Sequence, residues 1–427
     1  MDTFNGNHFN LDVDLISLQL IPHLEVSIRH KIKECITSIH WEYGCTITKT
    51  KAYLGSKRAF KIIYGDWDKS IASLPRYMAA LKHFNPGTVV EWKLEQSATI
   101  PEYIFRYVFW AFKRTIDGFV NCRPVISIDG TLVYGKYDIK LLIDVAVDVN
   151  GQIFPLAFAI CANESQEMWA LFLNHLKQHI VKQRSDICLI SDWHGGILSS
   201  VEDFPDWQEP YAYHCYCVRH LKANFQKKYL NKDLHDLMWM AATDHQQCKF
   251  RWRMESIRQL DKRAYNWLMR HELHKWTLHA DGGRQWGTIT TNVSESFNRL
   301  LKSARGFPVI AMVRMTFKQM AERFVERHKG ASELMERGVE FMPIPMKRFE
   351  KYRRRAHWHS YLQYDHSRGV FEVRTAIHQH RGNNIHIVNE ASRLCSCGKW
   401  TMYHMPCSHA MKCFQQTGLG ATNYVDR

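Results

Sequence analysis

The sequence predicts an α/β protein, because strand-like runs and a helical pattern alternate in its central part. Apolar runs at residues 125–128, 140–147 and 153–160 follow one another, and Asn150-Gly151 between the last two is typical of a hairpin turn. A helical pattern at residues 167–182 and a fourth apolar run at 187–190 come next. Three strands, a helix and another strand indicate an α/β core and exclude a plain helical bundle.

The rest of the chain divides around this core. We expect a tail at residues 1–25 and a helical subdomain at 26–95, which is either a plain bundle or a helix-turn-helix that binds DNA. The core domain is expected at 96–330, with a helical insertion at about 217–285 and a helix beginning near Asn292. A linker with a basic segment should follow at 331–364. Residues 365–427 should form a hairpin, from 371–375 and 385–388, that leads into a Cys/His cluster.

Composition narrows the classes of partner. The chain of 427 residues has 57 Lys and Arg against 42 Asp and Glu, a net charge of +15, which favours a polyanionic partner such as DNA. Its most apolar stretch, residues 141–159, is interrupted by Asp144, Asp148 and Asn150, so we expect no membrane span. The N-terminus lacks the pattern of a signal peptide. Twelve Cys are therefore expected to be reduced thiols or zinc ligands.

Three acidic residues are candidate metal ligands because of their positions next to predicted strands and at a predicted helix start. Asp129 and Asp192 each follow an apolar run, and Glu295 falls in the first turn of the helix that begins near Asn292. Converging carboxylates are hard oxygen ligands suited to Mg²⁺, and two such ions can activate a water or hydroxyl for phosphodiester chemistry. Each residue taken alone also has a structural interpretation: a turn for Asp129, a helix cap for Asp192 and a capping box for Glu295.

A second metal site is predicted near the C-terminus. Cys395, Cys397, Cys407 and His409 supply three thiolates and one imidazole, which match a tetrahedral structural zinc site. Unliganded thiols in a small domain are the alternative. Cys413 is more simply explained by packing than as a spare ligand.

Several motifs in a fixed order resemble the transposase of plant Mutator-like (MuDR) elements, over roughly residues 26–425. The motifs are IYGDW at 63–67, NPGTVV at 85–90, IDGT at 128–131, GKY at 135–137, QIFPLAFA at 152–159, ISD at 190–192, YCVRHL at 216–221 and TTNVSESFN at 290–298. The C-terminal cluster resembles the SWIM zinc finger that commonly follows this domain.

The resemblance implies an RNase H-like fold with a DDE triad formed by Asp129, Asp192 and Glu295, two catalytic Mg²⁺ or Mn²⁺ ions and structural Zn²⁺ in the finger. It implies a nuclear DNA transposase that cuts element ends and joins them to target DNA, working as a homo-oligomer. The family's Cys-x-x-His signature falls on Cys217 and His220, three apart on one helix face. These two residues would bind a metal or position DNA, while packing of the Cys is an equally simple reading.

A non-catalytic alternative remains open from the sequence. A domesticated or decayed transposase derivative could keep the fold and the finger and act as a DNA-binding transcription regulator. Retention of the three acids favours the enzyme, since a regulator has no need of them.

Overall fold

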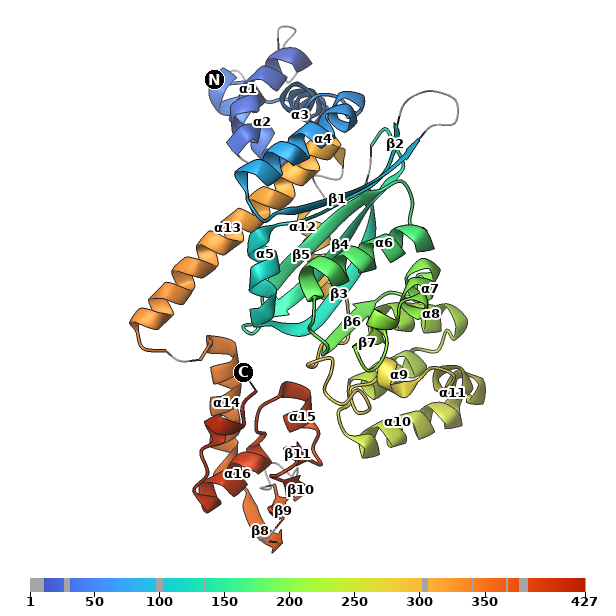
Figure 1. The fold of residues 1–427 in the computed structure, drawn as a ribbon, viewed down its shortest axis with the longest axis vertical. Coiled ribbons are helices and arrows are strands. Elements are labelled where there is room, and N and C mark those ends of the chain that lie inside the picture. The colour runs from blue at the N-terminus through green and yellow to red at the C-terminus, as the bar shows by residue number, and fades with distance from the viewer. Residues whose placement is uncertain are drawn as a thin grey trace.

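The computed structural model describes residues 11–26, 31–96, 103–133, 135–301, 306–339, 341–365, 368–375 and 383–426. Its centre is a seven-stranded sheet with helices packed on both faces (Figure 1). The four apolar runs predicted as strands are four of its strands, so the predicted α/β class is confirmed. The strands are β1 (Val89–Gln96), β2 (Tyr103–Ala111), β3 (Cys122–Val133), β4 (Ile139–Asp148), β5 (Ile153–Cys161), β6 (Ile187–Ser191) and β7 (Ala212–Tyr216).

The strand order is β1-β2-β5-β4-β3-β6-β7. β3, β4 and β5 form an antiparallel meander, and β6 and β7 join the other side of β3 in parallel. This mixed five-strand arrangement is that of an RNase H-like sheet, as the resemblance implied. The antiparallel hairpin β1–β2 extends the sheet beyond β5. The sheet thus begins at Val89, where the sequence predicts a short strand-like run at 88–92 within the otherwise helical segment 26–95.

Both faces of the sheet are buried because side chains alternate along each strand. On one face, Leu142 and Ala157 pack under α6 (Gln166–Leu176), which continues in a π-helical turn, and α7 (Gly195–Asp203). On the other face, Leu141 and Phe158 pack under α12 (Asn292–Leu300) and α13 (Val309–Glu336). The helix α5 (Lys113–Gly118) connects β2 to β3. The helix predicted near Asn292 is therefore present and covers the sheet.

The N-terminal helices are α1 (Val13–Val26), α2 (Ile32–Tyr43), α3 (Lys49–Tyr64) and α4 (Trp67–Phe84). The expectation of a tail at 1–25 is wrong for its second half, since Ile16, Leu20 and Leu24 of α1 are fully buried against α2 and α3. Gly55 of α3 permits close packing of α1, because a Cβ at this position would lie 2.3 Å from the Ile16 side chain. Residues 1–10 lie outside the described residues.

The insertion between β7 and α12 is helical, as predicted. It consists of α8 (Val218–Lys228), α9 (Lys232–Thr243), α10 (Gln247–Leu260) and α11 (Lys262–Met269), packed around their own core. Trp193, which directly follows Asp192, inserts into this core, with its ring centroid 4.7 Å from His271 and 5.9 Å from Trp267. The insertion is thus joined to the end of β6.

The segment expected as a linker at 331–364 is largely structured. α13 continues to Glu336, α14 (Pro343–Ala356) follows, and β8 (Ser360–Asp365) begins a four-stranded sheet. That sheet contains β9 (Val370–Arg374), β10 (Ile385–Asn389) and β11 (Leu394–Cys395), and the pairing of β9 with β10 confirms the predicted hairpin. The short helices α15 (Lys399–Tyr403) and α16 (Ser408–Thr417) complete this part. None of the helices in the described ranges has the length and apolarity needed to cross a membrane.

Candidate functional site

Asp129 lies in β3 and Asp192 directly follows β6, at corresponding positions relative to the pairing of these two parallel strands. The last residues paired between β3 and β6 are Ser127 and Ile190, and each aspartate comes two residues later. β3 remains paired with β4 beyond this point, so the carboxylates flank the place where β3 and β6 part. A crevice where neighbouring strands diverge at their carboxyl ends is a common ligand position in α/β sheets.

The helix α12 brings Glu295 to the same place. Asn298, one turn after Glu295, donates a hydrogen bond from its side-chain amide to Asp129 Oδ2. Glu295 itself accepts from the guanidinium of Arg219 on α8, which also donates to Asn292 Oδ1 over 2.9 Å. Helices α8 and α12 therefore hold the glutamate beside the part of β3 that carries Asp129. This aspartate lies inside β3, paired with Ile143 of β4, and not at the end of a strand as its place after an apolar run suggested.

The electrostatics of Asp129 reflect the two other acids. Burial, the neighbouring Asp192 and, more weakly, Glu295 raise the pKa of Asp129 to about 7, while Asn298 and His220 act in the opposite direction. A carboxylate with a raised pKa beside two further acids is a concentration of negative charge that a divalent cation relieves. The donor set consists of oxygens that suit Mg²⁺ or Mn²⁺.

Cys217 and His220 lie beside Glu295. Cys217, the N-cap of α8, is buried, and its Sγ accepts from the backbone N–H and the hydroxyl of Thr291, both over 3.3 Å. His220 Nε2 is 4.0 Å from Glu295 Oε1. Burial raises the pKa of the Cys217 thiol, but His220 and Thr291 outweigh it and the net direction is downward.

The pKa of the His220 imidazole shifts in the opposite direction, upward. Interaction with Cys217 raises the pKa of His220 to about 9, and Asp192 and Asp129 contribute in the same direction. A protonated His220 places positive charge near the carboxylates. Among the described residues, neither this pair nor the three acids Asp129, Asp192 and Glu295 form a group of three or more possible metal ligands whose ligand atoms all lie within 4.8 Å of one another.

Sequence reasoning missed the residues that connect these groups. Asn298 and Arg219 stand within quoted motifs, and their spacing along α12 and α8 was the available signal, since residues three or four apart share a helix face. Glu164, before α6, was also missed. A Cβ on Gly130 would lie 2.4 Å from its Oε1, so its carboxylate lies against the backbone next to Asp129.

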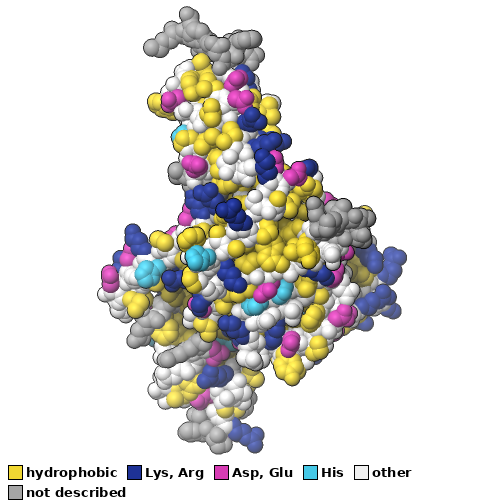
Figure 2. All heavy atoms as spheres, turned by 45° about the horizontal axis from the view of Figure 1, so that its top comes forward, with side chains coloured by type: hydrophobic (Ala, Val, Ile, Leu, Met, Phe, Trp, Pro, Cys, Tyr) yellow, Lys and Arg dark blue, Asp and Glu magenta, His cyan; other side chains and the backbone are white. Residues whose placement is uncertain are grey.

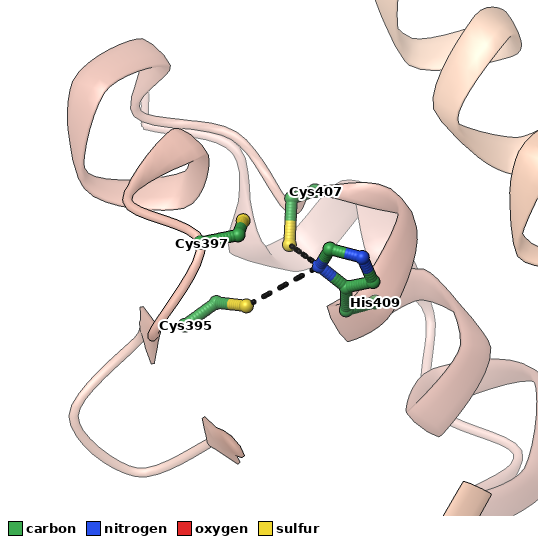
Figure 3. A group of neighbouring side chains, drawn as sticks. All are labelled: Cys395, Cys397, Cys407 and His409. Atoms are coloured by element: carbon green, nitrogen blue, oxygen red, sulfur yellow. Dashed lines mark hydrogen bonds between the residues drawn. The ribbon is translucent and has the colours of Figure 1, made fainter. Parts of the chain in front are cut away.

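The four predicted zinc ligands come together in the C-terminal part (Figure 3). Cys395 ends β11, Cys397 follows in the next turn, Cys407 is the N-cap of α16, and His409 lies in its first turn. Their ligand atoms all lie within 4.8 Å of one another. His409 Nδ1 is 3.5 Å from Cys395 Sγ and 3.7 Å from Cys407 Sγ.

The chemistry of this cluster fits Zn²⁺. All four side chains are buried, and His386 stacks on the His409 ring at a centroid distance of 4.1 Å. The neighbouring thiols raise the pKa of Cys395, and burial raises that of Cys407. A dication would stabilise the thiolates that such burial disfavours. The cluster can therefore hold zinc through three sulfurs and one nitrogen.

The segment between these ligands packs on the helical insertion. His404 stacks on Trp286 at a centroid distance of 3.8 Å and contacts Gly283 O through Nε2 over 3.0 Å. Gly283 has a positive φ, and a Cβ there would lie 2.4 Å from Thr401 O, so glycine permits the close approach. The C-terminal cluster is thus in contact with the loop that leads towards α12.

Comparison with known proteins agrees with the resemblance. No curated protein matches this chain. Residues 125–224 match the family model of the MULE transposase domain. The matched region includes Asp129, Asp192, Cys217 and His220, whereas Glu295 lies beyond it. Residues 125–224 are therefore similar to a MULE transposase domain, and a C-terminal Cys/His cluster compatible with a SWIM-type zinc finger lies further along the chain.

Proposed function

We propose that this chain is a DDE transposase whose Asp129, Asp192 and Glu295 together bind two Mg²⁺ or Mn²⁺ ions. The observation that carries the proposal is the position of Asp129 and Asp192 at the parting of β3 and β6, beside α12, the helix that carries Glu295 and bonds to Asp129 through Asn298. The match to a MULE transposase domain supports this choice over other uses of an acidic crevice.

The proposed reaction is hydrolysis of one DNA strand at an element end, followed by attack of the freed 3′-hydroxyl on target DNA. Bound divalent ions would supply activation of the nucleophile and stabilisation of the leaving oxygen. The protein's own groups would orient the site: Arg219 fixes the Glu295 carboxylate, and Asn298 fixes that of Asp129. The His220 imidazolium would add positive charge beside the acids as the phosphate approaches.

DNA is the proposed partner, both as element ends and as target. The net charge of +15 supports electrostatic attraction to phosphates. Lys and Arg side chains are spread over the face of the molecule shown in Figure 2. We further propose that the chain works in the nucleus and as a homo-oligomer, and that the zinc finger contributes DNA or protein contacts.

The test is Mn²⁺-dependent nicking of DNA that carries the parent element's ends. Wild type should cut, and Asp192→Asn should not, while both should bind DNA equally. Asp186→Asn is a matched control, because Asp186 precedes β6 at the opposite end of the same strand and pairs with Arg184 at 2.9 Å. It should cut like wild type.

Two other outcomes would refute the assignment. If Asp192→Asn cuts as fast as wild type, the site is elsewhere. If neither protein cuts but both bind DNA with the salt dependence of phosphate contacts, the chain is a non-catalytic DNA-binding regulator.

A further inference from the structure

Glu164 is held in place by the helices around it. It lies in the short connection between β5 and α6, two residues before Gln166, whose backbone carbonyl accepts from Ser200 Oγ of α7 over 2.9 Å. A Cβ on Gly196 would lie only 3.1 Å from the Gln166 nitrogen, so the missing side chain lets the connection approach α7. Glu164 therefore has a fixed backbone and is unlike a glutamate on a free surface loop.

The Glu164 carboxylate occupies the space that a side chain at position 130 would fill. A Cβ on Gly130 would lie 2.4 Å from Glu164 Oε1 and 2.8 Å from its Cδ. Gly130 comes directly after Asp129 and beyond the last β3–β6 pair. Because the strands part there, a side chain from the α6 face can reach the opening that Asp129 approaches from the α12 face.

The connection that carries Glu164 also approaches the turn after Asp192, since a Cβ on Gly196 would lie 3.2 Å from both the Ser165 carbonyl carbon and His194 Nδ1. Burial raises the pKa of Glu164 and His194 opposes this, while Asp192 raises it further and Lys140 and Trp169 lower it. Asp192 is fixed on its own side, since its Oδ1 accepts from the His194 backbone N–H over 3.1 Å. Lys140 forms its ion pair with Asp138, at 3.3 Å.

The neighbouring Glu167 differs from Glu164 in both exposure and partner. It lies in the first turn of α6, its side chain is 61% exposed, and it pairs with Lys93 of β1. Glu164 is half-buried, and both its burial and the Asp192 carboxylate make its ionised form less favourable. A cation between the two acids would remove this cost.

We propose that Glu164 is a fourth carboxylate of the catalytic metal site, binding the ion held at Asp192 either directly or through one of its waters. This inference rests on the proposed function, since it extends the same site. Mg²⁺ and Mn²⁺ take six oxygen ligands and usually retain several waters, so a triad leaves positions that a further carboxylate can occupy.

Mn²⁺ binding to the zinc-loaded full chain, followed by the electron paramagnetic resonance signal of free Mn²⁺, tests the proposal without relying on cleavage. Glu164→Gln should weaken Mn²⁺ binding about tenfold, the lower range for groups that support metal ligands. Gly130→Ala should weaken it similarly, because the new methyl group displaces the Glu164 carboxylate without removing charge. Glu167→Gln should bind Mn²⁺ like wild type.

Asp192→Asn, measured in parallel, separates the two proposals. If Asp192→Asn loses Mn²⁺ binding while Glu164→Gln and Gly130→Ala retain it, Glu164 is structural only and the inference is overturned. If no variant differs from wild type, or wild type binds no Mn²⁺ outside the finger, the proposed function fails as well. Circular dichroism checks folding, and if Glu164→Gln does not fold, Gly130→Ala decides the matter.

Discussion

Asp144, in the middle of β4, should carry a proton at pH values where most aspartates have lost theirs. Its side chain is fully buried, Oδ1 accepts from the Ala157 backbone N–H, and Oδ2 has no partner among the described residues. Burial raises the pKa of Asp144 well above its ordinary value of 3.8, more than the hydrogen bond lowers it. The variant Asp144→Asn keeps the acceptor that Ala157 uses and removes the ionisation.

The sign and size of the effect follow from proton linkage. Above about pH 4 the unfolded chain has lost this proton while the folded chain keeps it, so the free energy of unfolding falls as pH rises. One proton corresponds to about 1.4 kcal/mol per pH unit, until the pH reaches the pKa of the folded state. Asp144→Asn lacks this loss, so its free energy of unfolding relative to wild type should rise with pH, by up to about 1.4 kcal/mol per pH unit below the pKa of the folded state.

Urea unfolding followed by tryptophan fluorescence, at half-unit steps from pH 4.5 to 8, measures this difference. Asp138→Asn is the control, because the Asp138 side chain is 83% exposed; it should stay within about 0.5 kcal/mol of wild type at every pH. A difference between Asp144→Asn and wild type that does not change with pH would refute the reasoning, because Asp144 would then ionise alike in both states.

Three further outcomes are expected. Cys407→Ser should abolish zinc binding by the C-terminal cluster, measured as zinc content after dialysis. The control Cys413→Ser should retain the metal, because Cys413 lies outside the ligand set and donates to His409 O over 3.4 Å. Arg219→Met should slow DNA nicking at least about tenfold by freeing the Glu295 carboxylate. The control Arg258→Met, which loses only a surface pair with Glu255, should nick DNA like wild type. Equal nicking rates for Arg219→Met and wild type would contradict the orienting role of Arg219. His404→Ala should lower the free energy of unfolding by about 1–2 kcal/mol, because the stack on Trp286 and the hydrogen bonds of His404 are lost. The loss should appear as faster proteolysis in the 281–287 loop. Unchanged proteolysis would show that this contact does not hold the loop.

Local patterns predicted the centre of the fold well, and the reasons are physical. β3 to β6 read as apolar runs because both faces of the sheet are covered. β7 was missed because its five residues, Ala212–Tyr216, alternate small, aromatic and polar side chains and pair only with β6 at the sheet edge. The helix α1 was missed because its apolar face is recognisable only once α3 is packed against it.

The sequence by itself determined the strand runs, the acids that follow two of these runs and the spacing of the three Cys and one His, because each depends on residues close together in the chain. Only the tertiary structure decided which groups meet. Asn298 reaches Asp129 across 169 residues, and Arg219 reaches Glu295 across 76. Glu164 meets the backbone beside Asp129 only because Gly130 and Gly196 leave room on two different elements. Such contacts depend on how distant segments pack, and no local periodicity records that.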